Sequence, residues 1–221
     1  VNTGGKGIVV FNPLAWGVRN WVEVSLPKGW KTKTGIKAGG KVASQTLEIE
    51  RNEGSRIGFV GDIPPLGYKV YQAVPQGKEA GTRIKAEERA VETLFFRVEA
   101  DKTTGIIQVF DKDGKLLVKG NELVIEDESG DLYRHQSRFS TLIKSDSGEG
   151  FQYGSFKPKS FKIENGPLTT KIVFEEEYYC LTWPYRLKER FPPMVYKYKT
   201  LDIRKEVIVF KDLPRIEFIT R

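Results

Sequence analysis

The sequence is poor in the residues that most often bind metals and form disulfides. Among 221 residues there is one cysteine, Cys180, and one histidine, His135. A single cysteine cannot form an internal disulfide, which excludes the disulfide-supported folds of small secreted domains. One histidine and one distant cysteine cannot supply the ligands of a zinc site, so we expect no metal or other cofactor on this chain. Cys180 lies among aromatic residues, where we predict a buried apolar side chain rather than a nucleophile.

Sequence signatures of phosphate binding and of membrane insertion are also absent. No GxxxxGK[ST] or GxGxxG motif offers a phosphate-binding loop, and no GxSxG motif positions a serine nucleophile. No apolar run is long enough to cross a membrane, and no signal peptide begins the chain. We therefore expect no membrane contact and a cytoplasmic location.

The net charge of +7 does not come from a basic cluster. Glycine and threonine separate the lysines of residues 28–41, and Arg134 and Arg138 flank His135 without forming a run. Lysines spaced in this way are typical of a solvated loop or hairpin. We therefore expect no nucleic-acid partner.

Short runs of alternating apolar and polar residues fill most of the chain and predict an all-β fold. The first run is GIVVFN at residues 7–12, and the second is RNWVEVSLP at residues 19–27. In the second run the alternation places Val22, Val24 and Leu26 on one face and Trp21 on the other. Glycine, asparagine and proline separate the runs at intervals typical of a β-sandwich.

The chain divides into two predicted domains. Residues 1–75 form a small β-sandwich, residues 76–89 form a polar connector with two glycines, and residues 90–221 form a second domain. Asp113-Gly114 is the strongest hairpin signal of the second domain. The chain does not begin with Met and stops inside an alternating strand, so we expect a piece that is truncated at both ends, with an incomplete second domain. Its exposed strand edge would favour association between copies.

The stretch NELVIEDESGDLYRH, residues 121–135, concentrates chemically interesting side chains. Its carboxylates could form a cation site or the acid pair of a glycosidase, which needs two carboxyl groups across one bond. They are Glu126, Asp127, Glu128 and Asp131. Neighbouring residues of a strand point to opposite faces, so we favour a solvated strand end over either site.

A second candidate for sugar contact is the aromatic stretch that contains Trp183, Tyr185 and Phe191. Aromatic rings can stack on sugar rings, but on long strands they more often pack in a core or an interface. We favour the core or interface role.

Six stretches carry a resemblance when they are taken together in chain order. They are GIVVFNPLAW, DIPPLGYKVYQ, FFRVEADKTTGIIQVFDKDGKLL, GNELVIEDESGDLYRH, IENGPL and IRKEVIVFKDLPRIEFITR. In this order they resemble the β region that follows the catalytic domain of the family 38 α-mannosidases, and they span nearly the whole chain. No single stretch is diagnostic; the order carries the resemblance.

The resemblance implies a larger enzyme of which this chain is the non-catalytic part. A zinc-dependent α/β barrel with the nucleophilic aspartate, and then a helical bundle, would lie upstream. Residues 1–75 would be an immunoglobulin-like sandwich, and residues 90–221 would be the first part of a galactose-mutarotase-like supersandwich. The enzyme would remove terminal α-linked mannose with retention of configuration, and this chain alone would be inactive.

The resemblance also implies one contact with substrate. In family members a loop with a glycine and then a tyrosine reaches back to the catalytic pocket, which matches Gly130 and Tyr133. Tyr133 would hydrogen-bond at the bound α-mannoside, and Asp131 is a weaker candidate that would orient the turn. Arg134 and His135 depart from the acidic or aromatic residues that relatives often have next. The alternative is a carbohydrate-binding or scaffold module without chemistry.

Overall fold

The structure is a computed structural model that describes ten segments of the chain. They are residues 7–26, 34–47, 56–75, 85–86, 89–123, 126–128, 133, 137–140, 154–182 and 196–221. All regular secondary structure in these segments is β-strand, and every strand pairing is antiparallel. The predicted all-β class is therefore confirmed.

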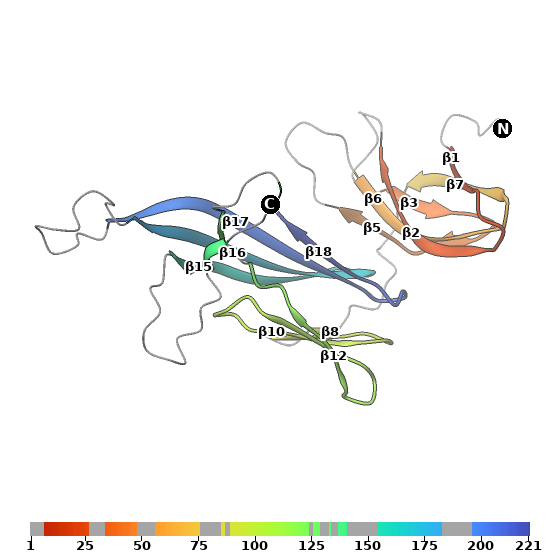
Figure 1. The fold of residues 1–221 in the computed structure, drawn as a ribbon. Helices are drawn as coiled ribbons and strands as arrows, with labels where there is room; N and C mark the ends of the chain where they lie inside the picture. The colour runs from red at the N-terminus through yellow and green to blue at the C-terminus, as the bar shows by residue number, and fades with distance from the viewer. Residues whose placement is uncertain are drawn as a thin grey trace, which may run out of the picture.

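The N-terminal unit consists of two sheets (Figure 1). Sheet I has the strand order β1-β7-β3-β4, with β1 at Gly7–Asn12, β7 at Gly67–Pro75, β3 at Thr34–Lys37 and β4 at Lys41–Val42. Sheet II has the order β2-β6-β5, with β2 at Val18–Ser25, β6 at Arg56–Ile63 and β5 at Ser44–Leu47.

The core of the N-terminal unit lies between sheets I and II. Ile36 and Tyr71 come from sheet I and Ile57 and Phe59 from sheet II, and all four are buried. The rings of Phe59 and Tyr71 lie 4.8 Å apart. Buried Leu26 joins the cluster, and Val22 and Val24 pack against it, as the alternation of β2 predicts.

The C-terminal unit has two larger sheets, one lying over the other in Figure 1. Sheet III has the order β12-β11-β10-β9-β8, with bounds Leu116–Gly120, Ile107–Phe110, Arg97–Ala100, Ala90–Glu92 and Lys85–Ala86. Sheet IV has the order β15-β16-β17-β18, with bounds Gly154–Asn165, Thr169–Thr182, Tyr196–Phe210 and Ile216–Thr220. β8 lies within the segment expected to be a connector, and it pairs with β9.

Apolar side chains from sheets III and IV meet in a second core. Val98, Ile107 and Val109 contribute from sheet III. Ile172, Phe174, Val207 and Val209 contribute from sheet IV. On β16 the alternating neighbours Lys171 and Glu175 lie on the opposite face. The predicted turn after β11 is also confirmed, because Gly114 has a φ of 81° and β11 pairs with β12.

A third, small sheet belongs to the same unit. β13 at Glu126–Glu128 pairs only with β14 at Ser137–Ser140 in the described part of the chain. β18 is an edge strand of sheet IV, and its Phe218 is exposed. Association between copies through this edge stays a prediction.

Candidate functional site

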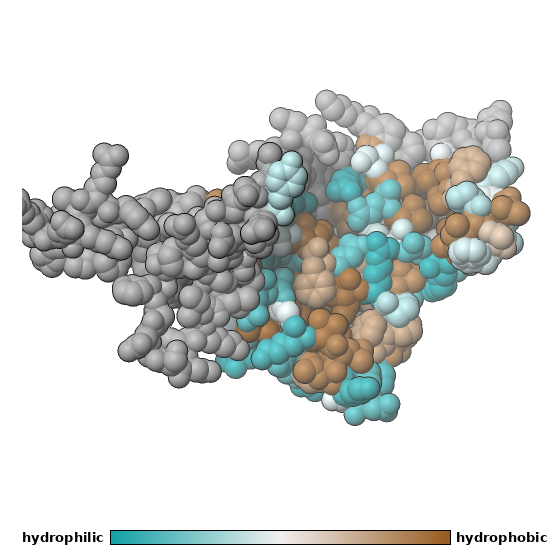
Figure 2. All heavy atoms as spheres, in the orientation of Figure 1, coloured by the Kyte–Doolittle hydropathy of each residue, from teal (hydrophilic) through white to brown (hydrophobic). Residues whose placement is uncertain are grey.

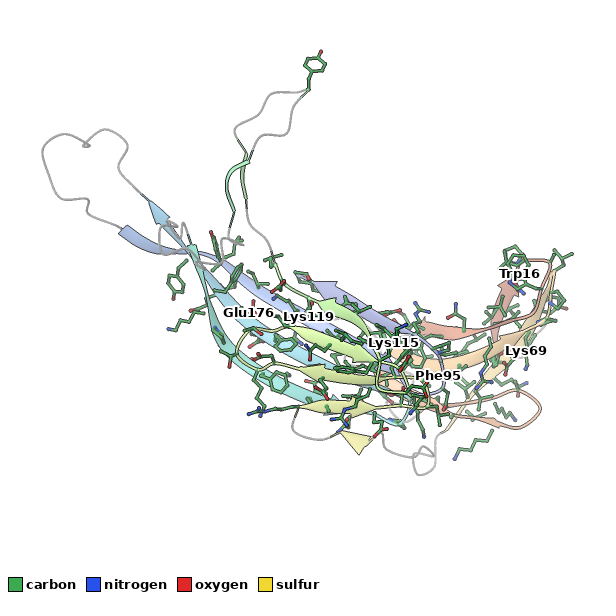
Figure 3. All side chains as sticks on the ribbon, turned by 60° about the horizontal axis from the view of Figure 1, so that its bottom comes forward. Trp16, Lys69, Phe95, Lys115, Lys119 and Glu176 are labelled. Carbon is green, nitrogen blue, oxygen red and sulfur yellow. The ribbon has the colours of Figure 1, made fainter. Side chains whose placement is uncertain are left out.

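Tyr133 lies between β13 and β14 in the chain and is 92% exposed. We call residues 126–128, 133 and 137–140 the Tyr133 arm. The green ribbon of its two strands stands away from the larger sheets in Figure 3. Contact between this exposed tyrosine and a sugar stays a prediction.

Several residues singled out in the sequence lie outside the described residues. They are Asp131, Arg134, His135, Trp183, Tyr185 and Phe191. The side chain of Cys180 is also outside the described part, although its backbone pairs with Gly154. Among the described residues no group of three or more His, Cys, Asp or Glu side chains could hold a metal ion.

A buried ion pair lies in the C-terminal core, and Figure 3 labels one of its members, Glu176. Glu176 of β16 and Lys205 of β17 both project toward sheet III, where Phe174 and Val207 are their apolar neighbours. Lys205 Nζ lies 3.0 Å from Glu176 Oε2 and 3.2 Å from Oε1. The side chains of Lys205 and Glu176 are only 3% and 6% exposed.

The lysine also reaches the chain segment that leads to the arm. Lys205 Nζ donates to the backbone carbonyl of Asn121, at 3.1 Å. Asn121 directly follows β12 and has a φ of 75°, in the left-handed region that only a few residue types adopt. Its Nδ2 donates to the carbonyl oxygen of Gly105, at 2.9 Å. We call Gly105, Asn121, Glu176 and Lys205 the anchor.

The turn over the ion pair requires glycine at position 105. Gly105 has a φ of 69°, and a Cβ there would lie 2.6 Å from Glu176 Oε1. The turn begins at Asp101, whose carboxylate accepts hydrogen bonds from the backbone N–H groups of Thr103 and Thr104. These bonds lower the pKa of Asp101 below its usual value. The turn is thus built to lie directly on the buried carboxylate.

The anchor satisfies the hydrogen-bonding groups that it buries. No buried side-chain nitrogen or oxygen in the described segments lacks a hydrogen-bond partner. Removing one charge would leave the other without its counter-ion in a core, which typically costs about 3 to 5 kcal/mol. The two charges therefore depend on each other and on the turns that cover them.

The anchor was not among the sites predicted from the sequence, although the sequence carries a signal for it. In IVFEEEYY the alternation puts Glu176 in phase with Ile172, Phe174 and Tyr178, which are buried. In IRKEVIVF it puts Lys205 in phase with Val207 and Val209. Charges of opposite sign at core positions of two successive long strands predict a buried pair.

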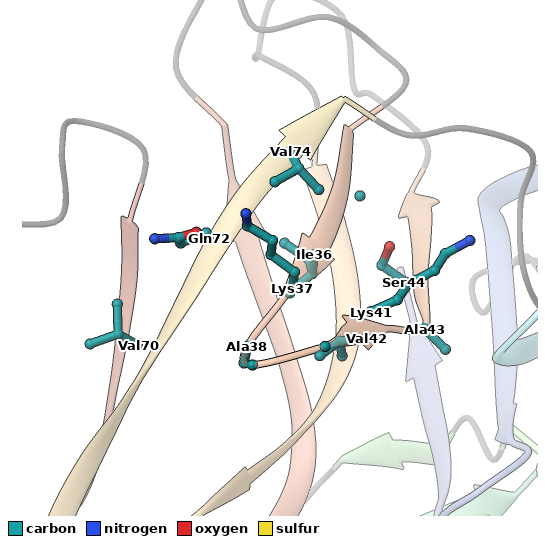
Figure 4. Close-up of a pocket in the computed structure, with 13 residues that line it drawn as sticks. Ile36, Lys37, Ala38, Lys41, Val42, Ala43, Ser44, Val70, Gln72 and Val74 are labelled. Atoms are coloured by element: carbon teal, nitrogen blue, oxygen red, sulfur yellow. The ribbon is translucent and has the colours of Figure 1, made fainter.

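Two grooves in the described segments are alternative sites. The first has a volume of about 730 Å³ and lies on β3, β4 and β7. Lys37 and Lys41 are cross-strand neighbours there, but Figure 4 shows their amino groups on different sides of the pocket. The remaining lining is mostly glycine and valine, with Gln72 and Ser44 as further polar groups. Polar groups do not converge on one point, as a binding site for a small polar ligand would require.

The second groove, of about 910 Å³, lies between the two units. Many charged groups in its lining are already ion-paired, for example Arg204 with Glu206 at 2.7 Å. At its floor, Gln45 Oε1 accepts from the backbone N–H groups of Leu168 and Thr169, both at 3.0 Å. The rings of Trp21 and Phe210 lie 5.3 Å apart, edge to face. These contacts make the groove a joint between the units.

An exposed apolar surface lies at the far end of the N-terminal unit, where Figure 3 labels Trp16 and Figure 2 shows brown side chains. Asn12, which is buried, donates from Nδ2 to the carbonyls of Trp16 and Pro64 at 2.7 and 3.0 Å. These bonds hold the turn after β1 against the turn before β7, and five large apolar residues on these turns and the adjoining strands are exposed. They are Phe11, Leu14, Trp16, Leu66 and Tyr68.

Comparison with known proteins gives no further guide to the site. No protein-family model matches the chain, and no curated protein matches it significantly. No helix in the described segments is long and apolar enough to cross a membrane.

Proposed function

We propose that the chain is the β region of an α-mannosidase-like glycoside hydrolase that removes terminal α-linked mannose. The observation that carries the proposal is the Tyr133 arm: a two-stranded extension outside both sandwiches with an almost fully exposed tyrosine. An exposed phenol on such an extension can reach a pocket on another part of the molecule. There it can donate or accept one hydrogen bond at a sugar hydroxyl or a carboxylate.

The arrangement of the six resembling stretches supports the proposal. The anchor joins three of them, because Gly105, Asn121 and Lys205 come from the third, fourth and sixth stretches. Asn12 and Pro64 join the first two. Stretches that are far apart in the chain thus meet at buried polar contacts, as expected of segments that define one fold.

In this proposal the catalytic groups lie on a barrel that is not part of this chain. Zinc, which polarises and orients the substrate, belongs to that barrel. The described residues bring no three potential metal ligands together, so we assign none of them to the metal. The roles proposed for this chain are to support the barrel and to present Tyr133. The immunoglobulin-like and supersandwich identities of its two units belong to the same proposal.

The test is the hydrolysis of an aryl α-mannoside by the longer protein that contains this chain. Tyr133→Phe removes one hydrogen bond at the sugar and keeps the ring, so we expect kcat/KM to fall about tenfold to a hundredfold, or ~1 to 3 kcal/mol. Tyr68→Phe, at another exposed tyrosine, is the matched control and should not change kcat/KM. Turnover by the isolated chain, or equal kcat/KM for the Tyr133 variant, would contradict the proposal.

A second candidate function is a carbohydrate-binding or scaffold module, and the exposed aromatic residues near Trp16 favour it. Aromatic faces on a rigid loop can stack on sugar rings. Calorimetric titration of the isolated chain with mannose and mannobiose separates the two candidates. Binding by the isolated chain, together with no hydrolysis by the longer protein, would favour the module.

A further inference from the structure

We propose that the anchor is a positioning device: the Glu176–Lys205 pair, acting through Asn121, fixes the direction in which the chain leaves the sandwich toward Tyr133. The inference deepens the proposed function. It rests on that function only for its purpose, because the direction of Tyr133 matters if Tyr133 contacts a substrate. The anchoring itself is a physical property of this chain and can be measured without any sugar.

Moving two charged groups into a core costs desolvation free energy, and an apolar pair of similar volume is often equally or more stable. Apolar side chains, however, could not hold a backbone carbonyl. Two of the contacts of the Lys205 ammonium are with the carboxylate of Glu176, and a third is with the carbonyl of Asn121. The ion pair thus provides a fixed donor at the end of β12.

Asn121 is held through its carbonyl by Lys205 and through its side chain by Gly105. Its left-handed φ of 75° turns the chain at the residue that directly follows β12. Gly105 lies directly against the carboxylate of Glu176, which also pairs with Lys205. Both partners of Asn121 are therefore in contact with the same buried carboxylate.

Asn121 precedes β13, which begins at Glu126, and it is hydrogen-bonded to the sandwich through Lys205 and Gly105. Within the described segments, the strands of the arm pair only with each other. Since these described strands share no sheet with the sandwiches, the hydrogen bonds of Asn121 fix the path of the chain toward the arm.

The test measures the distance between two nitroxide labels by double electron–electron resonance spectroscopy. The labels are attached at Tyr133→Cys on the arm and at Leu117→Cys on exposed β12, in a Cys180→Ser background. In the double variant Glu176→Gln/Lys205→Met, both groups keep their approximate size and lose their charge. Loss of a charge-assisted hydrogen bond should raise the ratio of released to anchored arms about tenfold to a hundredfold, which broadens the distance distribution.

Two further variants make the result decisive. Lys171→Met removes a lysine from the opposite face of β16, where it pairs with Glu206 at 3.6 Å, and should leave the distribution unchanged. Asn121→Gly keeps the left-handed φ and loses only the side-chain bond to Gly105, so we expect a smaller broadening. If the double variant does not fold, the distance distribution of Asn121→Gly tests the inference instead.

An unchanged distribution in a folded double variant, or in Asn121→Gly if the double variant unfolds, would overturn the inference. A fall in melting temperature without broadening would show that the pair is only structural. Neither result depends on mannosidase activity, so failure of the anchor and failure of the proposed function are distinguishable.

Discussion

Gly105 links one backbone torsion to the buried charge below it. Its φ of 69° is accessible to glycine without strain, and the absent side chain makes room for Glu176 Oε1. The neighbouring turn has a similar glycine, Gly114, with a φ of 81° and no atom within 4 Å of the position of a Cβ. Alanine substitutions at the two positions can therefore separate the free-energy cost of the left-handed torsion from the cost of the contact with Glu176.

We expect Gly105→Ala to destabilise the protein more than Gly114→Ala. At position 114 alanine has only the cost of the left-handed torsion, about 1 kcal/mol. At position 105 it must also displace the carboxylate of Glu176, which raises the expected loss to about 3 kcal/mol. Urea unfolding of both variants measures the difference, and equal losses would show that the contact with Glu176 contributes nothing.

At the scale of elements, one face of β16 and β17 contributes to the C-terminal core, and the opposite face, which we call the charged face, carries several ion pairs. On the charged face, Arg204 lies between Glu175 and Glu206, at 3.2 and 2.7 Å. The hydroxyl of Ser160 and the guanidinium of Arg204 hold the pKa of Glu175 below its usual value. Burial acts to raise the pKa of Glu206, but the hydrogen bond from Arg204 and the charge of Lys171 outweigh it, and that pKa is also lowered.

These shifts predict acid-sensitive stability. Because both carboxyl groups have a lower pKa in the folded state, the unfolded state binds more protons between about pH 5 and about pH 3. The stabilisation is complete above the unfolded pKa of about 4.3 and is lost as the pH falls through the lower folded values. Glu206 is buried and contributes most, whereas Glu175 is half-exposed and screened, so we expect a loss on the order of 1 kcal/mol.

Chemical denaturation at a series of pH values checks this expectation. The variant Arg204→Met removes the cation that both carboxylates share, and its unfolding free energy should depend less on pH in this range. A wild-type unfolding free energy that stays constant from about pH 5 to about pH 3 would contradict the assignment.

At the scale of the whole molecule, Gln45 joins the two units. Its side-chain oxygen accepts two backbone N–H groups of the turn between β15 and β16, and its Nε2 donates to the hydroxyl of Thr169 at 3.0 Å. Leu168 and Thr169 are buried, so their amides depend on this one side chain. Arg215 adds a hydrogen bond to Asn20 across the joint, at 2.7 Å.

We expect Gln45→Ala to uncouple the units. Two buried N–H groups would lose their acceptor, at about 1 to 3 kcal/mol each if water does not replace it. Calorimetry should then resolve two thermal transitions where the wild type has one, because an interface within a chain couples two folding units only while it is stable. Gln72→Ala, on an exposed position of β7, is the control and should keep one transition. A single transition in the Gln45 variant would show that the apolar contacts of the joint are sufficient.

The sequence by itself determined the strands and their inward faces. The period of two in β2 follows from the pleat, which sends successive side chains to opposite faces, so its apolar residues at every second position predict the face that packs on the core. The Asp113-Gly114 turn is equally local, because only the residues of the turn decide whether φ above zero is accessible.

Only the tertiary structure decided which distant residues meet. Glu176 and Lys205 become partners because β16 and β17 pair in one particular register, which brings Lys205 opposite Phe174, two residues from Glu176. Gln45 and Thr169 meet across 124 positions of sequence because two separately folded sandwiches dock. A local pattern predicts which face of a strand a residue occupies. The free energy of a buried polar contact, however, depends on a partner whose position is set by the packing of whole sheets.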